Sequence, residues 1–184
     1  ILVVSAIFYY IDNNKARQFT TTSTTINITT TAQRFIFPPL INGFKISVES
    51  TFPSQFASPI LSSNLSGSYM ATYINTSNEN NSVLLRLLKY SNPSSAYNAY
   101  EYIINITGAP NTSYVQCNNP YFSSGVKCIY VNQYPQIYSV SYINGSEVFT
   151  ASFSPQGNIT NQTQIFNLLI NMIHKAYISY ISSS

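Results

Sequence analysis

Short segments of alternating apolar and polar residues make up most of the chain from Arg34 onward. They end at Asn, Gly, Pro or Ser, a pattern that is typical of β-strands. We expect strands at 34–37, 44–52, 67–75, 82–90, 113–117, 126–133, 136–143 and 146–153. The last two flank Asn144-Gly145, a dipeptide that favours a type I′ hairpin turn. The pattern therefore predicts a domain built mainly from antiparallel strands.

Two segments show helical spacing instead. One opens with Asn92-Pro93, a capping residue followed by proline at the first helical position, and we expect it to run to about Ile104. The other is expected from about Gln162 to Ser179. The apolar stripes are Ala96, Ala99, Tyr100 and Ile103 in the first, and Ile165, Leu169, Met172, Ile173, Ala176 and Tyr180 in the second. We interpret both stripes as faces that pack on the core.

Residues 1–11 are nearly all apolar. The run is too short to span a membrane as a helix, which takes about 20 residues. It also lacks the basic start and the small-residue cleavage site of a signal peptide. We predict a strand buried on both faces, and no membrane span in the mature chain. The residues expected to make its contacts are Ile1, Leu2, Val3, Val4, Ile7, Phe8, Tyr9, Tyr10 and Ile11.

Residues 20–31 are dominated by Thr, which disfavours helix and favours an extended chain. We interpret 12–33 as an extended tether, and a disordered low-complexity linker is the alternative. The expected organisation is an N-terminal extension, 1–33, followed by a β-rich head domain, 34–184.

Charge is scarce in this sequence. Charged residues are 7% of the 184 residues, and the net charge is +3. Ordinary soluble domains carry roughly 25%. Lys and Arg this dilute do not form a nucleic-acid footprint, so we expect no nucleic-acid partner.

Asn, Ser and Thr supply the polarity, with 21, 27 and 16 copies. They form nine Asn-x-Ser/Thr sequons, where chance would give roughly 5. We predict that N-glycans keep the surface soluble, and the alternative is a plain polar surface rich in turn residues. The candidate sites are Asn27, Asn64, Asn75, Asn80, Asn105, Asn111, Asn144, Asn158 and Asn161.

Cys117 and Cys128 flank a stretch rich in turn residues, so we predict a local disulfide. A disulfide is typical of an oxidising, extracellular compartment. The alternative is a pair of reduced thiols.

The sequence contains few groups that could carry out catalysis. His174 is the only histidine and has no zinc-ligand spacing with the cysteines. A Cys128–His174 nucleophilic pair is conceivable only if Cys128 is not disulfide-bonded. Glu49 and Glu147, if they lay on neighbouring strands, could serve as a glycosidase pair. We interpret these side chains as structural or surface groups, and we expect no enzyme activity, no metal site and no cofactor other than covalent N-glycans.

An apolar strand, a polar tether and a β-rich glycosylated domain form the layout of a donor-strand pilin, in which one subunit completes the sheet of the next. On Ile1–Ile11, the Thr tract with Asn27-Ile28-Thr29 and the dense sequons, the chain resembles the subunit of archaeal thread filaments, glycosylated surface fibres of thermoacidophilic archaea. The resemblance implies an immunoglobulin-like head broadly similar to bacterial type I pilins. It also implies a head-to-tail homopolymer of identical subunits outside the cell, with a role in adhesion or cell–cell contact.

The two predicted helices are more than a pure pilin sandwich carries. We therefore expect a mainly β (α+β) fold: an antiparallel sandwich or immunoglobulin-like pilin head with one or two helices, plus an N-terminal donor-strand extension. A type IV-like pilin is disfavoured because its long apolar N-terminal helix would not stop at Asp12 and continue into Thr. A monomeric secreted domain that binds glycans, or an adhesin contacting surface glycans or other cells, is the second alternative.

Overall fold

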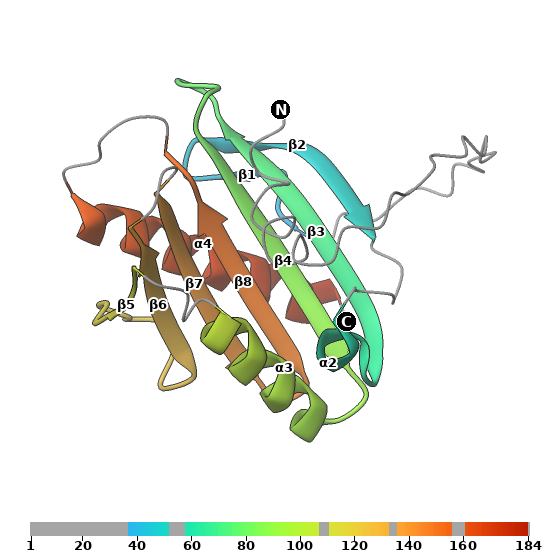
Figure 1. Cartoon of the computed structure of the whole chain (residues 1–184). Helices are drawn as coiled ribbons and strands as arrows, with labels where there is room; N and C mark the ends of the chain where they lie inside the picture. Colours follow the sequence, from blue (N-terminus) through green and yellow to red (C-terminus); the bar gives the residue numbers. More distant parts are fainter. Residues whose placement is uncertain (1–36, 52–57, 107–110, 133–135, 156–160, 184) are drawn as a thin grey trace, which may run out of the picture. The chain divides into compact units, whose positions relative to one another are not determined.

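The computed structural model describes residues 37–51, 58–106, 111–132, 136–155 and 161–183 (Figure 1). They belong to one unit of the chain, Ile36–Ser184. The predicted donor strand 1–11, the tether 12–33, and the sequons at Asn27 and Asn158 lie outside the described residues. These four remain predictions.

One antiparallel sheet of eight strands dominates the described residues. Its strands are β1 (Leu40–Ile41), β2 (Phe44–Thr51), β3 (Leu65–Asn75), β4 (Ser82–Tyr90), β5 (Thr112–Val115), β6 (Val126–Val131), β7 (Ile137–Asn144) and β8 (Glu147–Phe153). In space they follow the order β1-β2-β3-β4-β8-β7-β6-β5. The predicted mainly β, antiparallel α+β class is confirmed, and helices form the layers on the two faces of the sheet.

The first hairpin was not predicted. Of the strand expected at 34–37 only Phe37 is described, and it lies in a bend. Strand β1 begins at Leu40, and the two-residue turn Asn42-Gly43 joins it to β2. Both turn residues have positive φ, 49° and 79°, as a type I′ turn requires. The Asn-Gly dipeptide is the sequence signal that could have revealed this hairpin.

The hairpin predicted at β7–β8 is present, but its turn lies one residue further on. Asn144 pairs with Glu147, so the turn residues are Gly145 and Ser146. Gly145 has φ +55°, and Ser146 is not among the residues with positive φ. This is the pattern of a type II′ turn, in which the first central residue alone is left-handed. The predicted type I′ turn on Asn144-Gly145 was therefore wrong in register and in type.

Both predicted helices are confirmed. Helix α3 (Pro93–Ile106) starts as expected, because the Asn92 Oδ1 atom accepts a hydrogen bond from the Ser95 amide at 2.9 Å. Helix α4 (Gln162–Ser183) runs four residues past its predicted end at Ser179. The short helix α2 (Pro59–Ser62) was not predicted, since four residues are too few to show a helical period.

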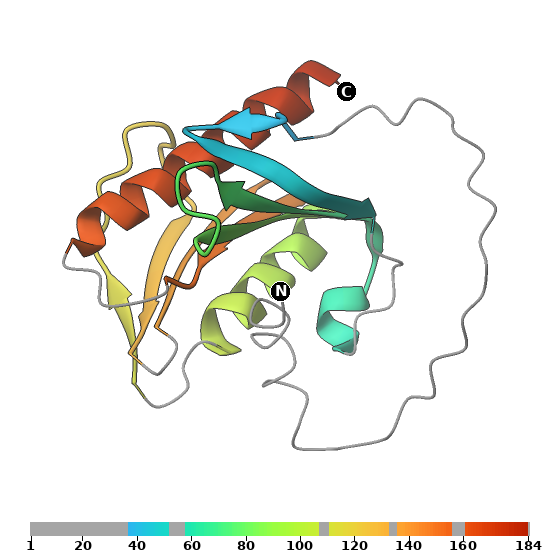
Figure 2. The ribbon, with the colours of Figure 1, turned by 90° about the horizontal axis from the view of Figure 1, so that it is seen from above.

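Figure 2 shows α4 on one face of the sheet and α3 with α2 on the other. The α4 face holds the larger apolar cluster, to which Leu169 and Ile173 of α4 and Leu85 of β4 belong. The α3 face holds a second cluster, which includes Tyr100 and Leu88. Strand β4 contributes to both clusters, which is why its sequence is apolar on both sides.

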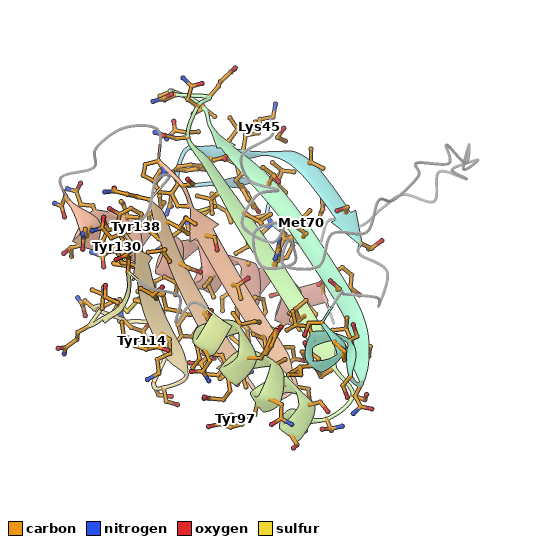
Figure 3. All side chains as sticks on the ribbon, viewed as in Figure 1. Lys45, Met70, Tyr97, Tyr114, Tyr130 and Tyr138 are labelled. Carbon is orange, nitrogen blue, oxygen red and sulfur yellow. A yellow bond between two sulfur atoms is a disulfide. The ribbon has the colours of Figure 1, made fainter. Side chains whose placement is uncertain are left out.

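Aromatic residues fill much of the sheet. Tyr130 of β6 and Tyr138 of β7 lie side by side with ring centroids 4.9 Å apart (Figure 3). Two buried Tyr hydroxyls donate to backbone carbonyls: Tyr73 to Pro38 at 2.7 Å and Tyr90 to Leu61 at 3.0 Å. Burial raises the pKa of Tyr73, so its hydroxyl stays protonated at neutral pH.

Candidate functional surface

Seven of the nine sequons lie in the described residues, all of them at ends of strands and helices or in the loops between them. Six of their Asn residues are exposed and Asn75 is half-buried. The structure therefore leaves most of these predicted sites accessible to solvent. Occupancy itself remains a prediction. The exposed set is Asn64, Asn80, Asn105, Asn111, Asn144 and Asn161.

The sequon side chains differ in which atom they use. The Asn161 Oδ1 atom accepts a hydrogen bond from the Gln164 amide at 3.2 Å and so caps α4, a contact that uses the oxygen and not the nitrogen of the side chain. The Asn75 Oδ1 atom likewise accepts from the Ser77 amide at 2.8 Å. At Asn144 the Nδ2 nitrogen itself is engaged, because it donates to the Tyr177 hydroxyl at 3.2 Å. The hydrogen bonding of the Asn side chain, and with it the setting of Nδ2, therefore differs between these sites.

The predicted disulfide is confirmed. Cys117 and Cys128 are bonded, with Cα atoms 6.1 Å apart. Cys128 is buried in β6 within the α4-face cluster, and Cys117 follows β5. The bond closes the loop between these two strands, in which the Asn119 Oδ1 atom accepts from the Tyr121 and Phe122 amides at 3.2 and 3.1 Å. A disulfided Cys128 offers no thiolate, which excludes the Cys128–His174 nucleophilic pair.

This disulfide loop contacts α4 through aromatic rings. Tyr121 stacks on His174 at 4.3 Å between centroids, with the rings 9° from parallel. Phe122 stacks on Tyr142 at 3.8 Å, and Tyr177 meets both of these rings edge-on. We call Phe122, Tyr142, Phe149 and Tyr177 the aromatic cluster. Sequence reasoning missed it, because its members come from a loop, two strands and a helix with no shared spacing.

His174 has a structural setting. Burial, and secondarily the neighbouring Lys175, lowers the pKa of its imidazole below the ordinary value. The ring is therefore neutral at physiological pH and stacks on Tyr121 as an uncharged aromatic ring. The sequence interpretation of His174 as a structural or solvated residue agrees with this placement.

The carboxylates Glu49 and Glu147 do not form a pair. Glu49 lies on β2 and Glu147 on β8, and β3 and β4 separate these strands in the sheet. Three strand spacings amount to about 14 Å, which exceeds the roughly 10 Å that a glycosidase pair allows. The assumption that they lie on neighbouring strands was wrong. In the described part of the chain no group of three or more metal-ligating side chains is found.

Arg86 of β4 is a half-buried cation on the α3 side of the sheet. Its register partners are Met70 on β3 and Thr150 on β8. Burial lowers the pKa of its guanidinium to about 10, so it remains charged at neutral pH. An acidic or strongly polar neighbour would stabilise a guanidinium that is partly removed from water.

The outer side of β2 is the long open edge among the described strands. Strand β1 covers only its start, where Leu40 lies opposite Lys45 and the Ile46 amide donates to the Pro39 carbonyl at 3.0 Å. From there to Thr51 no described strand pairs with β2 on this side.

A β-bulge marks this edge. The register shifts between Ile46, which lies opposite Tyr73, and Val48, which lies opposite Thr72. Adjacent residues of β3 point to opposite faces, so the bulge turns Val48 away from the α4 face. Val48 is 55% exposed and Leu40 is 59% exposed. This part of β2 therefore has no described strand beside it and carries exposed apolar side chains.

None of the described helices is both long and apolar enough to cross a membrane.

Together these features define a mainly β, α+β domain with one disulfide and exposed sequons. No family model matches the chain, and no curated protein matches it. Among solved structures it is similar to the extracellular domain of PknH from Mycobacterium tuberculosis, with a TM-score of 0.41, 11% identity, and coverage of 72% of this chain and 86% of that chain.

A chain from Bacteroides thetaiotaomicron VPI-5482 gives a TM-score of 0.36 and 17% identity, covering 74% of this chain and 46% of that one. Likenesses this distant identify neither a family nor an activity.

Proposed function

We propose that this chain is a glycosylated structural subunit of an extracellular filament, in which Ile1–Ile11 of one subunit adds as a strand to the outer side of β2 in the next. The open edge of β2 is the observation that carries the proposal. Unprotected edges pair readily with an extra strand, and natural proteins usually cover or blunt them. Strand addition of this kind gains affinity from backbone hydrogen bonds and specificity from alternate side chains.

The apolar character of both partners supports this assignment. The donor segment is nearly continuous in apolar residues, and the acceptor edge exposes Leu40 and Val48. Since donor and acceptor are different surfaces of one subunit, the contact is head-to-tail and builds an open polymer. The role of such a polymer at the cell surface is adhesion or cell–cell contact.

The extracellular setting is supported by two further features. The Cys117–Cys128 disulfide is typical of an oxidising compartment. The exposed sequons compensate for the scarcity of charge, because glycans are strongly hydrated. On this proposal the chain has no catalytic role.

Deletion of residues 1–11 tests the polymer directly. We expect the truncated chain to remain monomeric in light scattering, whereas the full chain assembles. A synthetic peptide of residues 1–11 should bind the truncated chain in a one-to-one complex, and a scrambled peptide of the same composition should not. Normal filaments from the truncated chain would refute the proposal.

A secreted glycan-binding domain is the second candidate, and the Tyr121–His174 pair favours it. Tyr121 is 43% exposed, and its hydroxyl accepts a hydrogen bond from Asn171 Nδ2 at 2.7 Å. A fixed, partly exposed ring is a suitable platform for a sugar. Binding to a glycan array that Tyr121→Ala abolishes, in material that is monomeric when isolated, would favour this candidate over the filament.

A further inference from the structure

Exposed apolar side chains lie together near the end of α4. Ile178 and Ile181 are 45% and 47% exposed. Ile181 lies three residues after Ile178 and four residues after Tyr177, so each of these two side chains is a neighbour of Ile181 on the helix surface. Single exposed apolar residues are common, and Ile178 and Ile181 form a small apolar patch that a bound group can cover.

The nitrogen of a predicted glycosylation site lies beside this surface. Asn144 is exposed at the tip of the β7–β8 hairpin, and its Nδ2 nitrogen is 3.2 Å from the Tyr177 hydroxyl. An N-linked sugar attaches to this nitrogen. The substituted amide keeps one N–H, so the hydrogen bond to Tyr177 is compatible with the modification. The first sugar at Asn144 would therefore start within a few ångströms of the Tyr177 ring.

Three aromatic neighbours pack against the ring of Tyr177. It meets Phe122, Tyr142 and Phe149 edge-on, with centroids 6.2, 5.9 and 5.8 Å away. A ring fixed by three neighbours loses little freedom when a ligand packs on it. Tyr combines an apolar body with a polar tip, which suits a pyranose ring whose C–H groups lie on one face and whose hydroxyls point outward.

We propose that Asn144 carries an N-linked glycan whose first hexopyranose packs on Tyr177 and whose following sugars cover Ile181. This inference rests on the glycoprotein surface proposed above. The glycan at this site then acts as part of the packed structure, because it covers apolar surface at the end of α4. Asn80 provides a contrast, since it is an exposed sequon residue in the loop between β3 and β4, followed by Asn81 and Ser82.

Thermal unfolding of the full chain from a glycosylating host tests the proposal. We expect Asn144→Gln to lower Tm by about 2 to 4 °C, whereas Asn80→Gln changes Tm by less than about 1 °C. The same two variants, produced without glycosylation, control for the lost amide itself. In that material Asn144→Gln should change Tm by less than about 1 °C.

A second pair of variants tests the role of the ring. In glycosylated protein that carries Tyr177→Leu, adding Asn144→Gln should lower Tm by less than about 1 °C. In glycosylated protein that carries Tyr177→Phe, adding Asn144→Gln should lower Tm by the full amount of about 2 to 4 °C. If Tyr177→Leu does not fold, Ile181→Ser at the exposed surface serves instead, and it should reduce the effect of the glycan.

Mass spectrometry of the native material separates the outcomes. Sugar on other sequons but not on Asn144 would overturn this inference and leave the glycoprotein surface standing. If Asn144 carries a sugar but Asn144→Gln lowers Tm equally with Tyr177 and with Tyr177→Leu, the proposed packing of the sugar on Tyr177 is wrong. An unoccupied Asn144, with Ile181 protected by a second copy of the chain, would assign the surface to an interface instead. Absence of sugar from every sequon would refute the glycoprotein surface as well.

Discussion

The two edges of the sheet end in different ways. At one edge β5 is only four residues long, the disulfide fixes the loop that follows it, and the Tyr114 hydroxyl donates to the Ile104 carbonyl of α3 at 3.1 Å. At the other edge β1 covers only the start of β2, and Val48 is left exposed. A covalent bond and a side-chain contact finish the first edge within the subunit. At the second edge no described strand pairs with β2 beyond the part that β1 covers, and this difference makes it the candidate for completion by another chain.

A charge on the open edge should have the largest effect. Val48→Lys places a cation where the donor strand is proposed to add, so we expect assembly to weaken at least tenfold, which corresponds to about 1.4 kcal/mol. Sedimentation of assembled material measures this. Tyr97→Lys is the matched control, because Tyr97 of α3 is also 55% exposed but lies away from this edge. Equal assembly of the two variants would show that β2 is not the acceptor.

Removing the disulfide should destabilise the closed edge. Replacing both cysteines with Ser releases a loop that spans 11 residues. The chain-entropy model then predicts a loss of about 3 kcal/mol in the free energy of unfolding. Guanidinium unfolding of the chain lacking residues 1–11 measures it without interference from assembly. A loss below about 1 kcal/mol would mean that the disulfide adds little to what the strand pairing of β5 already supplies.

Two glycines allow the edges to be compared with one substitution. Gly43 and Gly125 have φ of +79° and +77°, so alanine is strained at both by about 1 to 2 kcal/mol. A Cβ atom at Gly125 would also lie 2.7 Å from the Ile143 carbonyl oxygen, whereas at Gly43 its nearest neighbour, Thr76 Oγ1, is 4.0 Å away.

We therefore expect Gly125→Ala to cost about 1 to 3 kcal/mol more than Gly43→Ala in the same unfolding measurement. Equal losses would show that the loop at Gly125 moves freely away from β7. That result would remove the contrast between the fixed edge and the open one.

The smallest expected effect is a pH dependence from His174 of α4, which stacks on Tyr121 of the disulfide loop. The folded-state pKa of His174 is lowered, so the unfolded chain binds a proton more readily. Stability should fall as pH drops below the unfolded value of about 6.5 and level off below the folded pKa. His174→Phe keeps a ring against Tyr121 and should remove this dependence. Urea unfolding at about pH 7.5 and about pH 5, above the range of the carboxylates, makes the comparison.

Much of the fold could be predicted from the sequence, because buried apolar residues recur at regular spacing within each strand and helix. The strand predicted at 82–90 and the cap at Asn92 match the structure. Elements as short as β1 and α2 carry too few residues for a period to appear. The order of strands could not be predicted either, because the β4–β8 pairing joins distant segments and leaves no local pattern. The same reason explains the wrong pairing of Glu49 with Glu147.

The candidate surface was predicted in part. Sequon positions and the disulfide follow from residue identity and spacing, so sequence alone located them. The aromatic cluster and the open side of β2 depend on tertiary contacts, and only the structure shows them. The need for glycine at position 125 is a similar case, because the Ile143 carbonyl that leaves no room for a Cβ atom lies far from Gly125 in sequence.

The central pairing of β4 with β8 also sets the order in which the protein can fold during synthesis. Leu85 lies opposite Ala151, so the middle of the sheet cannot close until most of the chain has been made. Helix α4, which supplies Leu169 and Ile173 to the core, is made later still. Contacts this distant in sequence form slowly. Until β8 has been made, enzymes that attach sugars or oxidise cysteines would therefore meet both thiols and the sequons that precede β8 in an open chain.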